Sequence, residues 1–277
     1  MGLDVGRGPR HYALCGVLGF LSVRFALAAA APAPYAARKV ARRTLVAGAG
    51  IGLVLALGYL LQTTSLLFTT PSNFVLITGL FVVFAPLADR VLSGAPPSRP
   101  VLVALLLSIL GMFLLAEGGP DEVNRGDLLT LLCAGALGLH IALLSRYART
   151  HETSGLAFAQ MLSMALVFGF LWPLFEPVTL PSREVWMPLL ATSLVASAGA
   201  FWVQTFVQQR ISAARTAVIL TTEPIFAALF GYWLAGDRLV LVQIFGAALI
   251  LSALAASEVA PVVFDRSKPR KKGDVSR

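Results

Sequence analysis

Residues 59–94, "YLLQTTSLLFTTPSNFVLITGLFVVFAPLADRVLSG", align without a gap on residues 201–236, "FWVQTFVQQRISAARTAVILTTEPIFAALFGYWLAG". The offset of 142 residues places Gln62 on Gln204 and ends both segments on a glycine. Matched leucines in apolar helices are common coincidences, whereas a matched Gln-Thr pair, a matched glycine and matched segment ends are not. The two stretches therefore predict an internal repeat, a frequent organisation of membrane proteins with several spans.

The composition indicates a membrane protein. Hydrophobic residues make up 57% and charged residues 13% of the 277 residues, with a mean hydropathy of +0.79, whereas a soluble domain has about 45–50% apolar and about 25% charged residues. No segment alternates apolar and polar residues over about ten positions, as a membrane barrel would. We therefore predict an all-α integral membrane protein.

Segment length, proline and glycine positions and charges together predict about nine membrane-spanning helices. These spans are roughly 13–31, 45–64, 72–91, 100–117, 127–147, 154–174, 186–208, 213–234 and 239–257. The offset of 142 residues relates the first span to the sixth and spans two to four to spans seven to nine, whereas the fifth has no counterpart. We expect two inverted five-helix repeats, with the first helix of repeat one absent through a late start or real loss.

The repeat also divides the chain into regions. We expect an N-terminal segment at 1–12, a first repeat of four helices at 13–118, a second repeat of five helices at 126–258, and a basic tail at 259–277. An odd number of helices per repeat inserts the two repeats with opposite orientation. A competing interpretation makes residues 1–31 a cleaved signal peptide, because "ALAAAAPAP" contains an A-x-A site. N-terminal sequencing of the mature protein distinguishes the two.

Lys and Arg residues predict the orientation. The net charge is +8, and an alternating arrangement places 16 Lys and Arg residues on the side of the C-terminal tail and five on the other. Short loops rich in Lys and Arg stay in the cytoplasm. We therefore expect a multi-pass protein of the cell membrane with a cytoplasmic C-terminus. RNA or acidic lipid remains an alternative partner for the tail.

Three further stretches carry a family resemblance: "SVRFALAAA" (22–30), "GDLLTLLCAGALGLHIALLSRYA" (126–148) and "TTEPIFAALFGYWLAGDRL" (221–239). Together with the repeat, they resemble EamA-type members of the drug/metabolite transporter superfamily over nearly the whole chain. The resemblance implies two five-helix repeats and a secondary carrier that moves a small metabolite or toxic compound, commonly outward, by alternating access. The family's usual first helix, with its Trp-Gly motif, is missing. A transport-inactive scaffold or degenerate paralogue is therefore the alternative.

Two charged residues, Arg24 and Glu223, lie well inside predicted spans, away from the span ends. An ionised group near the bilayer centre costs about 2.5–3.5 kcal/mol, so each requires a reason. Glu223 precedes Pro224, which removes a backbone donor and can kink the helix. Glu223 is a candidate to carry a coupled proton, or else a structural lock between the repeats. Arg24, in the first span, is a candidate partner for an acidic group or an anionic substrate, or it extends to the membrane surface.

Uncharged polar and aromatic residues supply the remaining cavity candidates. They are Tyr59, Gln62, Asn73, His140, Phe201, Trp202 and Gln204. Two pairs among them, Tyr59 with Phe201 and Gln62 with Gln204, occupy equivalent repeat positions, which favours a shared cavity. The alternative for the polar residues is hydrogen bonding between helices, worth about 0.6 kcal/mol per bond in membranes.

Enzyme signatures are missing from the sequence. It has no phosphate-binding Gly-rich loop followed by lysine and no His-Glu-x-x-His, and its three histidines do not have the spacing of metal ligands. We expect no enzymatic activity, no metal, no cofactor and no nucleic-acid partner. The expected partners are a small-molecule substrate and the lipid bilayer, with a coupled proton and a homodimer as further candidates.

Overall fold

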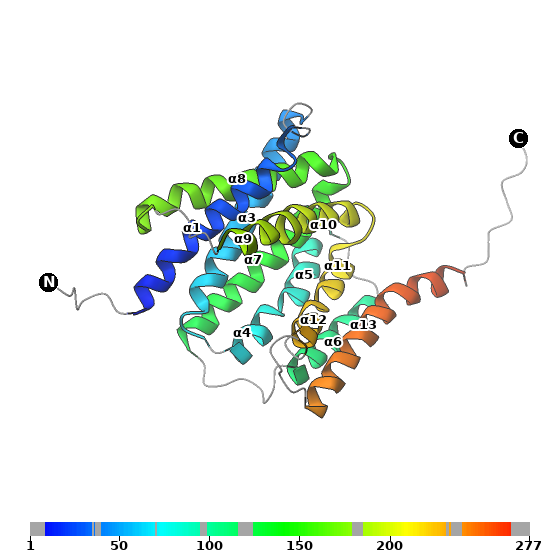
Figure 1. The fold of residues 1–277 in the computed structure, drawn as a ribbon. Coiled ribbons are helices and arrows are strands. Elements are labelled where there is room, and N and C mark those ends of the chain that lie inside the picture. The colour runs from blue at the N-terminus through cyan, green and yellow to red at the C-terminus, as the bar shows by residue number, and fades with distance from the viewer. Residues whose placement is uncertain are drawn as a thin grey trace, which may run out of the picture.

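The computed structural model describes residues 9–34, 36, 40–69, 71–94, 99–115, 124–178, 185–230, 233 and 240–266, and every regular element in these ranges is helical. Figure 1 shows the helices gathered into one bundle. Their bounds are α1 Pro9–Ala30, α3 Arg42–Ser65, α4 Pro71–Thr78, α5 Phe81–Ser93, α6 Arg99–Leu115, α7 Arg125–Ala148, α8 Thr153–Phe175, α9 Trp186–Ser193, a π-helix Leu194–Gly199, α10 Ala200–Gln208, α11 Ala213–Leu220, α12 Glu223–Phe230 and α13 Leu241–Arg266.

Each of the nine predicted spans contains at least one of these helices. Five described segments are long and apolar enough to cross a membrane, and three shorter apolar helices accompany them. Large apolar side chains such as Leu106, Phe170 and Val195 are 65–75% exposed, as expected for surfaces that face lipid. The prediction of an all-α membrane protein is therefore confirmed. The predicted N-terminal segment and the basic tail lie largely outside the described residues.

Glycines allow α3 to pack directly on the backbone of α8. A Cβ atom at Gly48 would lie 2.4 Å from the Cβ of Ala159, and one at Gly52 would lie 2.6 Å from the carbonyl oxygen of Gln160. The stretch "GAGIG" (48–52) therefore places α3 against α8 along its inner face, as small residues do in membrane helices. This contact fixes the position of Gln160 in the interior of the bundle.

A buried carboxylate holds α1 beside the end of α8. Glu176, which follows α8 and is 6% exposed, accepts hydrogen bonds from the backbone N–H groups of Leu18 at 2.8 Å and Gly19 at 2.9 Å. Each carboxylate oxygen thus takes one donor. Hydrogen bonds to a carboxylate are stronger than those between neutral groups, so this contact holds the two helices together.

Two predicted spans are each divided into two helices. The third divides at Gly79 and Leu80, between α4 and α5, and the eighth divides at Thr221 and Thr222, between α11 and α12. The same offset of 142 residues relates the two breaks. In each break the chain tightens into a turn, since Leu80 N–H donates to Ile77 O, and Thr222 N–H donates to Ile219 O, both at 3.1 Å.

The position of the breaks follows from helix geometry. α4 and α11 have eight residues each, which at 1.5 Å per residue span about 12 Å, close to half of a hydrocarbon layer about 30 Å thick. Helix α6 contacts both breaks: Met112 fills the space beside Gly79, and Ser108 accepts a hydrogen bond from the Thr221 hydroxyl at 3.4 Å. The two broken helices therefore meet α6 near the middle of the bundle.

Candidate functional site

A cluster of aromatic rings surrounds Phe25, which is fully buried on α1. Tyr59 from α3 meets Phe25 edge-on at 5.4 Å between ring centroids, Phe168 from α8 stacks at 5.9 Å, and Phe201 from α10 lies at 6.4 Å. The two repeat-equivalent candidates, Tyr59 and Phe201, thus contact the same ring. They form the apolar wall of the candidate site.

Arg24 lies next to this wall and is held by a distorted helix. Its Nε donates to the hydroxyl of Ser197 at 2.8 Å, and its guanidinium carbon is 5.5 Å from the Phe25 ring centroid. Ser197 belongs to the π-helix Leu194–Gly199, the type of local distortion that is frequent at functional sites. Among the described residues Arg24 forms no ion pair.

Glu223 is the first residue of α12, directly after the second break. Its side chain is exposed rather than enclosed by other side chains. The Tyr59 hydroxyl lies within electrostatic range of both Arg24 and Glu223. The fold therefore brings a cation, a phenol and a carboxylate from α1, α3 and α12 into one neighbourhood. The sequence alone does not predict that residues on these three helices lie near one another.

Polar groups without protein partners lie on the same helices. The half-buried side-chain amides of Gln62 and Gln204 form no hydrogen bond within the described part of the chain. The hydroxyl of Thr78, the residue directly before the first break, is buried and also has no partner there. Groups of this kind can bond to a substrate or to water.

His140 takes part in a closed hydrogen-bond network. The ring is 2% exposed, and its Nε2 lies 3.0 Å from Gln160 Oε1, which can only accept, so Nε2 donates. Gln160 Nε2 in turn donates to Leu156 O at 3.3 Å and approaches Thr205 Oγ1 at 3.5 Å. This network joins α7, α8 and α10. His140 therefore forms hydrogen bonds between helices, which the sequence analysis gave as the alternative to a place in the cavity.

Asn73 and Trp202 lie away from the aromatic cluster. Asn73 is fully buried, and its Nδ2 donates to Asp127 Oδ2 at 3.0 Å, which ties α4 to the start of α7. Trp202 is 42% exposed, stacks on Phe206 at 5.4 Å between centroids, and donates from Nε1 to Ser154 Oγ at 3.1 Å. Neither side chain contacts Phe25 or Arg24 in these interactions.

Sequence reasoning missed Asp127. This residue is 5% exposed and forms a capping box with Asn124, whose backbone N–H donates to Asp127 Oδ2 at 2.9 Å. It also accepts a hydrogen bond from Thr69 Oγ1. The signal was present in the sequence as Asn-x-x-Asp directly before an apolar run, which is a helix-start pattern.

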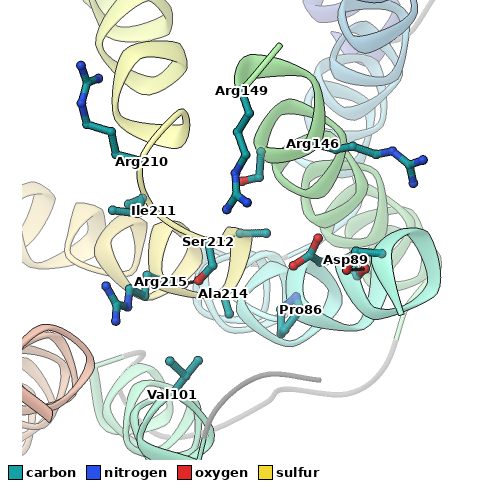
Figure 2. Close-up of a pocket in the computed structure, with 13 residues that line it drawn as sticks. Pro86, Asp89, Val101, Arg146, Arg149, Arg210, Ile211, Ser212, Ala214 and Arg215 are labelled. Carbon is teal, nitrogen blue, oxygen red and sulfur yellow. Dashed lines mark hydrogen bonds between the residues drawn. The ribbon is translucent and has the colours of Figure 1, made fainter. Parts of the chain in front are cut away.

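Sequence reasoning also missed a basic pocket at the other end of the bundle. It has a volume of about 490 Å³ and lies between α5, the end of α7 and the start of α11. Figure 2 shows Arg146, Arg149, Arg210 and Arg215 around it, with one acidic residue, Asp89. In the sequence these arginines served only as indicators of membrane orientation. Among all the described residues, including those of this pocket, no group of three His, Cys, Asp or Glu side chains could hold a metal ion.

The comparisons with known proteins agree with this architecture. Residues 124–257 match the model of the EamA-like transporter family. A protein from Archaeoglobus fulgidus, described as an uncharacterized transporter, is 34% identical over 211 residues, which cover 75% of this chain and 67% of the relative. The chain belongs to the EamA-like transporter family.

Membership defines the class of activity. The protein is a multi-pass membrane transporter, and a small molecule is its substrate. A solved crystal structure with 20% sequence identity superposes with a TM-score of 0.75, covering 90% of this chain and 91% of that one. At that identity the likeness shows the shared fold and nothing about the substrate.

Proposed function

We propose that the protein is a secondary active transporter that exports a small metabolite or toxic compound across the cell membrane by alternating access. In this proposal the four-helix unit 13–118 and the five-helix unit 126–258 rock against each other, with the C-terminus in the cytoplasm. The two helix breaks support it, because carriers with inverted repeats place substrate sites at discontinuous helices near the midplane. The breaks are 142 residues apart and contact the same helix, α6.

The observation that carries the proposal is that Arg24 and Tyr59 both lie against the Phe25 ring, while Glu223 begins α12 directly after the second break. An apolar wall, one cation and one anion suit a small molecule with an apolar body and charged groups. The unpartnered amides of Gln62 and Gln204 add hydrogen-bonding capacity. A rigid structural core would instead pair these groups with one another, as it does for His140 and Gln160.

We further propose that Glu223 carries the coupled proton. The first repeat has Phe81 at the equivalent position, so only one of the two breaks presents a carboxylate. A single titratable group that alternates between the two sides of the membrane can couple proton entry to substrate exit. The asymmetry distinguishes Glu223 from a residue required by the repeated scaffold itself.

The experiment is a metabolite-resistance screen in a bacterial host that lacks its own exporters, followed by transport assays with the compound identified. We expect Glu223→Gln to abolish most of the export and its dependence on pH at matched expression. Glu122→Gln, which changes a glutamate that lies in sequence between α6 and α7, is the matched control. Export by Glu223→Gln with an unchanged pH dependence would contradict proton coupling, and loss of folded protein would indicate a structural lock instead.

A further inference from the structure

The basic pocket shown in Figure 2 has no role in the proposed transport site. Its lining comes from α5, the first residues of α6, the end of α7 and the α10–α11 connection. Its volume of about 490 Å³ lies within the range of about 300–1,000 Å³ that is usual for small-molecule sites. The arginines place it at the end of the bundle that their distribution predicts to be cytoplasmic.

Two of the four arginines are engaged with the protein. Arg146 Nη1 donates to the carbonyl oxygen of Leu92. Arg210 Nη1 donates to the carbonyl oxygen of Phe206 at 2.9 Å, and its guanidinium carbon lies 4.0 Å from the Phe206 ring centroid. In Figure 2 both guanidinium groups turn away from the centre of the pocket. They contribute positive potential there but not direct contacts.

Of the other two arginines, only Arg149 differs in this respect, since Figure 2 shows the Arg215 side chain also extending away from the centre of the pocket. Figure 2 shows Arg149 extending from the end of α7 toward Ser212 and the side of the pocket that carries Asp89. Within the described chain, the guanidinium groups of Arg149 and Arg215 donate no hydrogen bond. Asp89 is within electrostatic range of Arg149. Its single carboxylate leaves a clear excess of positive charge in the pocket.

Backbone donors strengthen the preference for an anion. Ala213 and Ala214, the first residues of α11, line the pocket, and the first N–H groups of a helix have no partner within the helix. The positive end of the α11 dipole therefore faces the same space as the Arg149 guanidinium. Hydroxyl groups of Ser93, Ser145 and Ser212 complete the polar lining.

We propose that this pocket binds the phosphate group of an anionic ligand. Guanidinium groups bind phosphate oxygens in a bidentate manner, and donors from α7 and α11 approach from different sides, which matches a group with several acceptor oxygens. The volume leaves room for an organic portion beyond the phosphate. The phosphate belongs either to an acidic lipid of the cytoplasmic leaflet or to a soluble organic phosphate, and the chemistry of recognition is the same.

The test uses the full chain in two settings. In nanodiscs of neutral phosphatidylcholine, sodium pyrophosphate is titrated against sodium chloride of equal ionic strength, and binding is followed by the shift in Tm. In nanodiscs containing phosphatidylglycerol, native mass spectrometry counts the lipids retained. We expect saturable binding in at least one setting, and that setting identifies the source of the phosphate. Arg149→Gln should weaken it about tenfold.

Two variants separate recognition from general charge. Arg90→Gln removes an exposed arginine from α5 outside the pocket and should leave binding within about twofold of the unaltered protein, because exposed charges are largely screened. Asp89→Asn removes the one carboxylate of the pocket and should tighten binding. Absence of saturable binding in both settings would overturn the proposal. So would equal weakening by Arg149→Gln and Arg90→Gln, or weaker binding of these anions by Asp89→Asn, because a carboxylate in the pocket repels an anion bound there.

Discussion

The contact between α3 and α8 gives a quantitative prediction for Gly52→Ala. The added Cβ would lie 2.6 Å from the carbonyl oxygen and 2.9 Å from the Cα of Gln160. Both are backbone atoms, so no side-chain rotation relieves the overlap. The two helices must separate by several tenths of an ångström, and overpacking of this kind costs about 1–3 kcal/mol of folding free energy. Relative to an alanine that α3 accommodates without overlap, such as Gly50→Ala, the expected fall in Tm is about 2–12 °C at about 2–4 °C per kcal/mol.

Gly52→Ala should also disturb the hydrogen bonds between His140, Gln160 and Thr205. Gln160 holds the His140 ring at 3.0 Å, and displacement of the α8 backbone moves this amide away from α7. We therefore expect Gly52→Ala to lower transport by more than its effect on expression explains.

Gly50→Ala is the matched control, because a Cβ at Gly50 has no heavy atom within 4 Å. Alanine is a better helix former than glycine by about 1 kcal/mol, so its Tm should be unchanged or slightly higher. The assay is thermal unfolding in detergent, followed by size-exclusion chromatography of fluorescent fusions. If Gly52→Ala and Gly50→Ala unfold at the same temperature, the close packing of α3 on α8 is wrong.

Two further predictions concern polar contacts. Asn73→Ala and Asp127→Ala should each lower the Tm, because either variant loses the hydrogen bond between the two side chains. The double variant loses this bond only once, so it should be more stable than the sum of the two single effects implies, by about 0.5–3 kcal/mol. Additive effects would contradict the hydrogen bond. Ser197→Ala removes the acceptor for Arg24 Nε, which is worth about 1.5–3 kcal/mol for a charged donor. We expect a lower Tm together with a higher KM for the identified substrate, whereas an unaltered KM would show that Ser197 does not position Arg24.

The sequence was sufficient to predict the helices and the class of protein. Membrane spans can be predicted from local composition, because every backbone polar group in hydrocarbon must be satisfied within its own helix. The likeness of residues 59–94 to residues 201–236 likewise indicated the repeat, because comparing two segments of sequence requires no knowledge of the contacts in the fold. Tyr59 and Phe201 were chosen from that likeness, and both contact Phe25 in the structure.

The helix breaks were beyond local reasoning. Pro224 suggested a kink in the eighth span, but Gly79 and Leu80 gave no comparable signal in the third. Met112 of α6 fills the space beside Gly79 at this break, a contact between residues far apart in the chain. The π-helix that carries Ser197 is similarly distant in sequence from Arg24, its hydrogen-bond partner.

The sequence by itself determined that this chain is a membrane protein and roughly where its apolar helical segments lie along the chain. Only the tertiary structure decided which polar residues are paired and which are not. Asn73 and His140 form hydrogen bonds within the interior, whereas Arg149 and Arg215 line a pocket without such partners. The physical reason is that hydropathy is a property of each segment, whereas hydrogen bonding depends on which helices pack against each other.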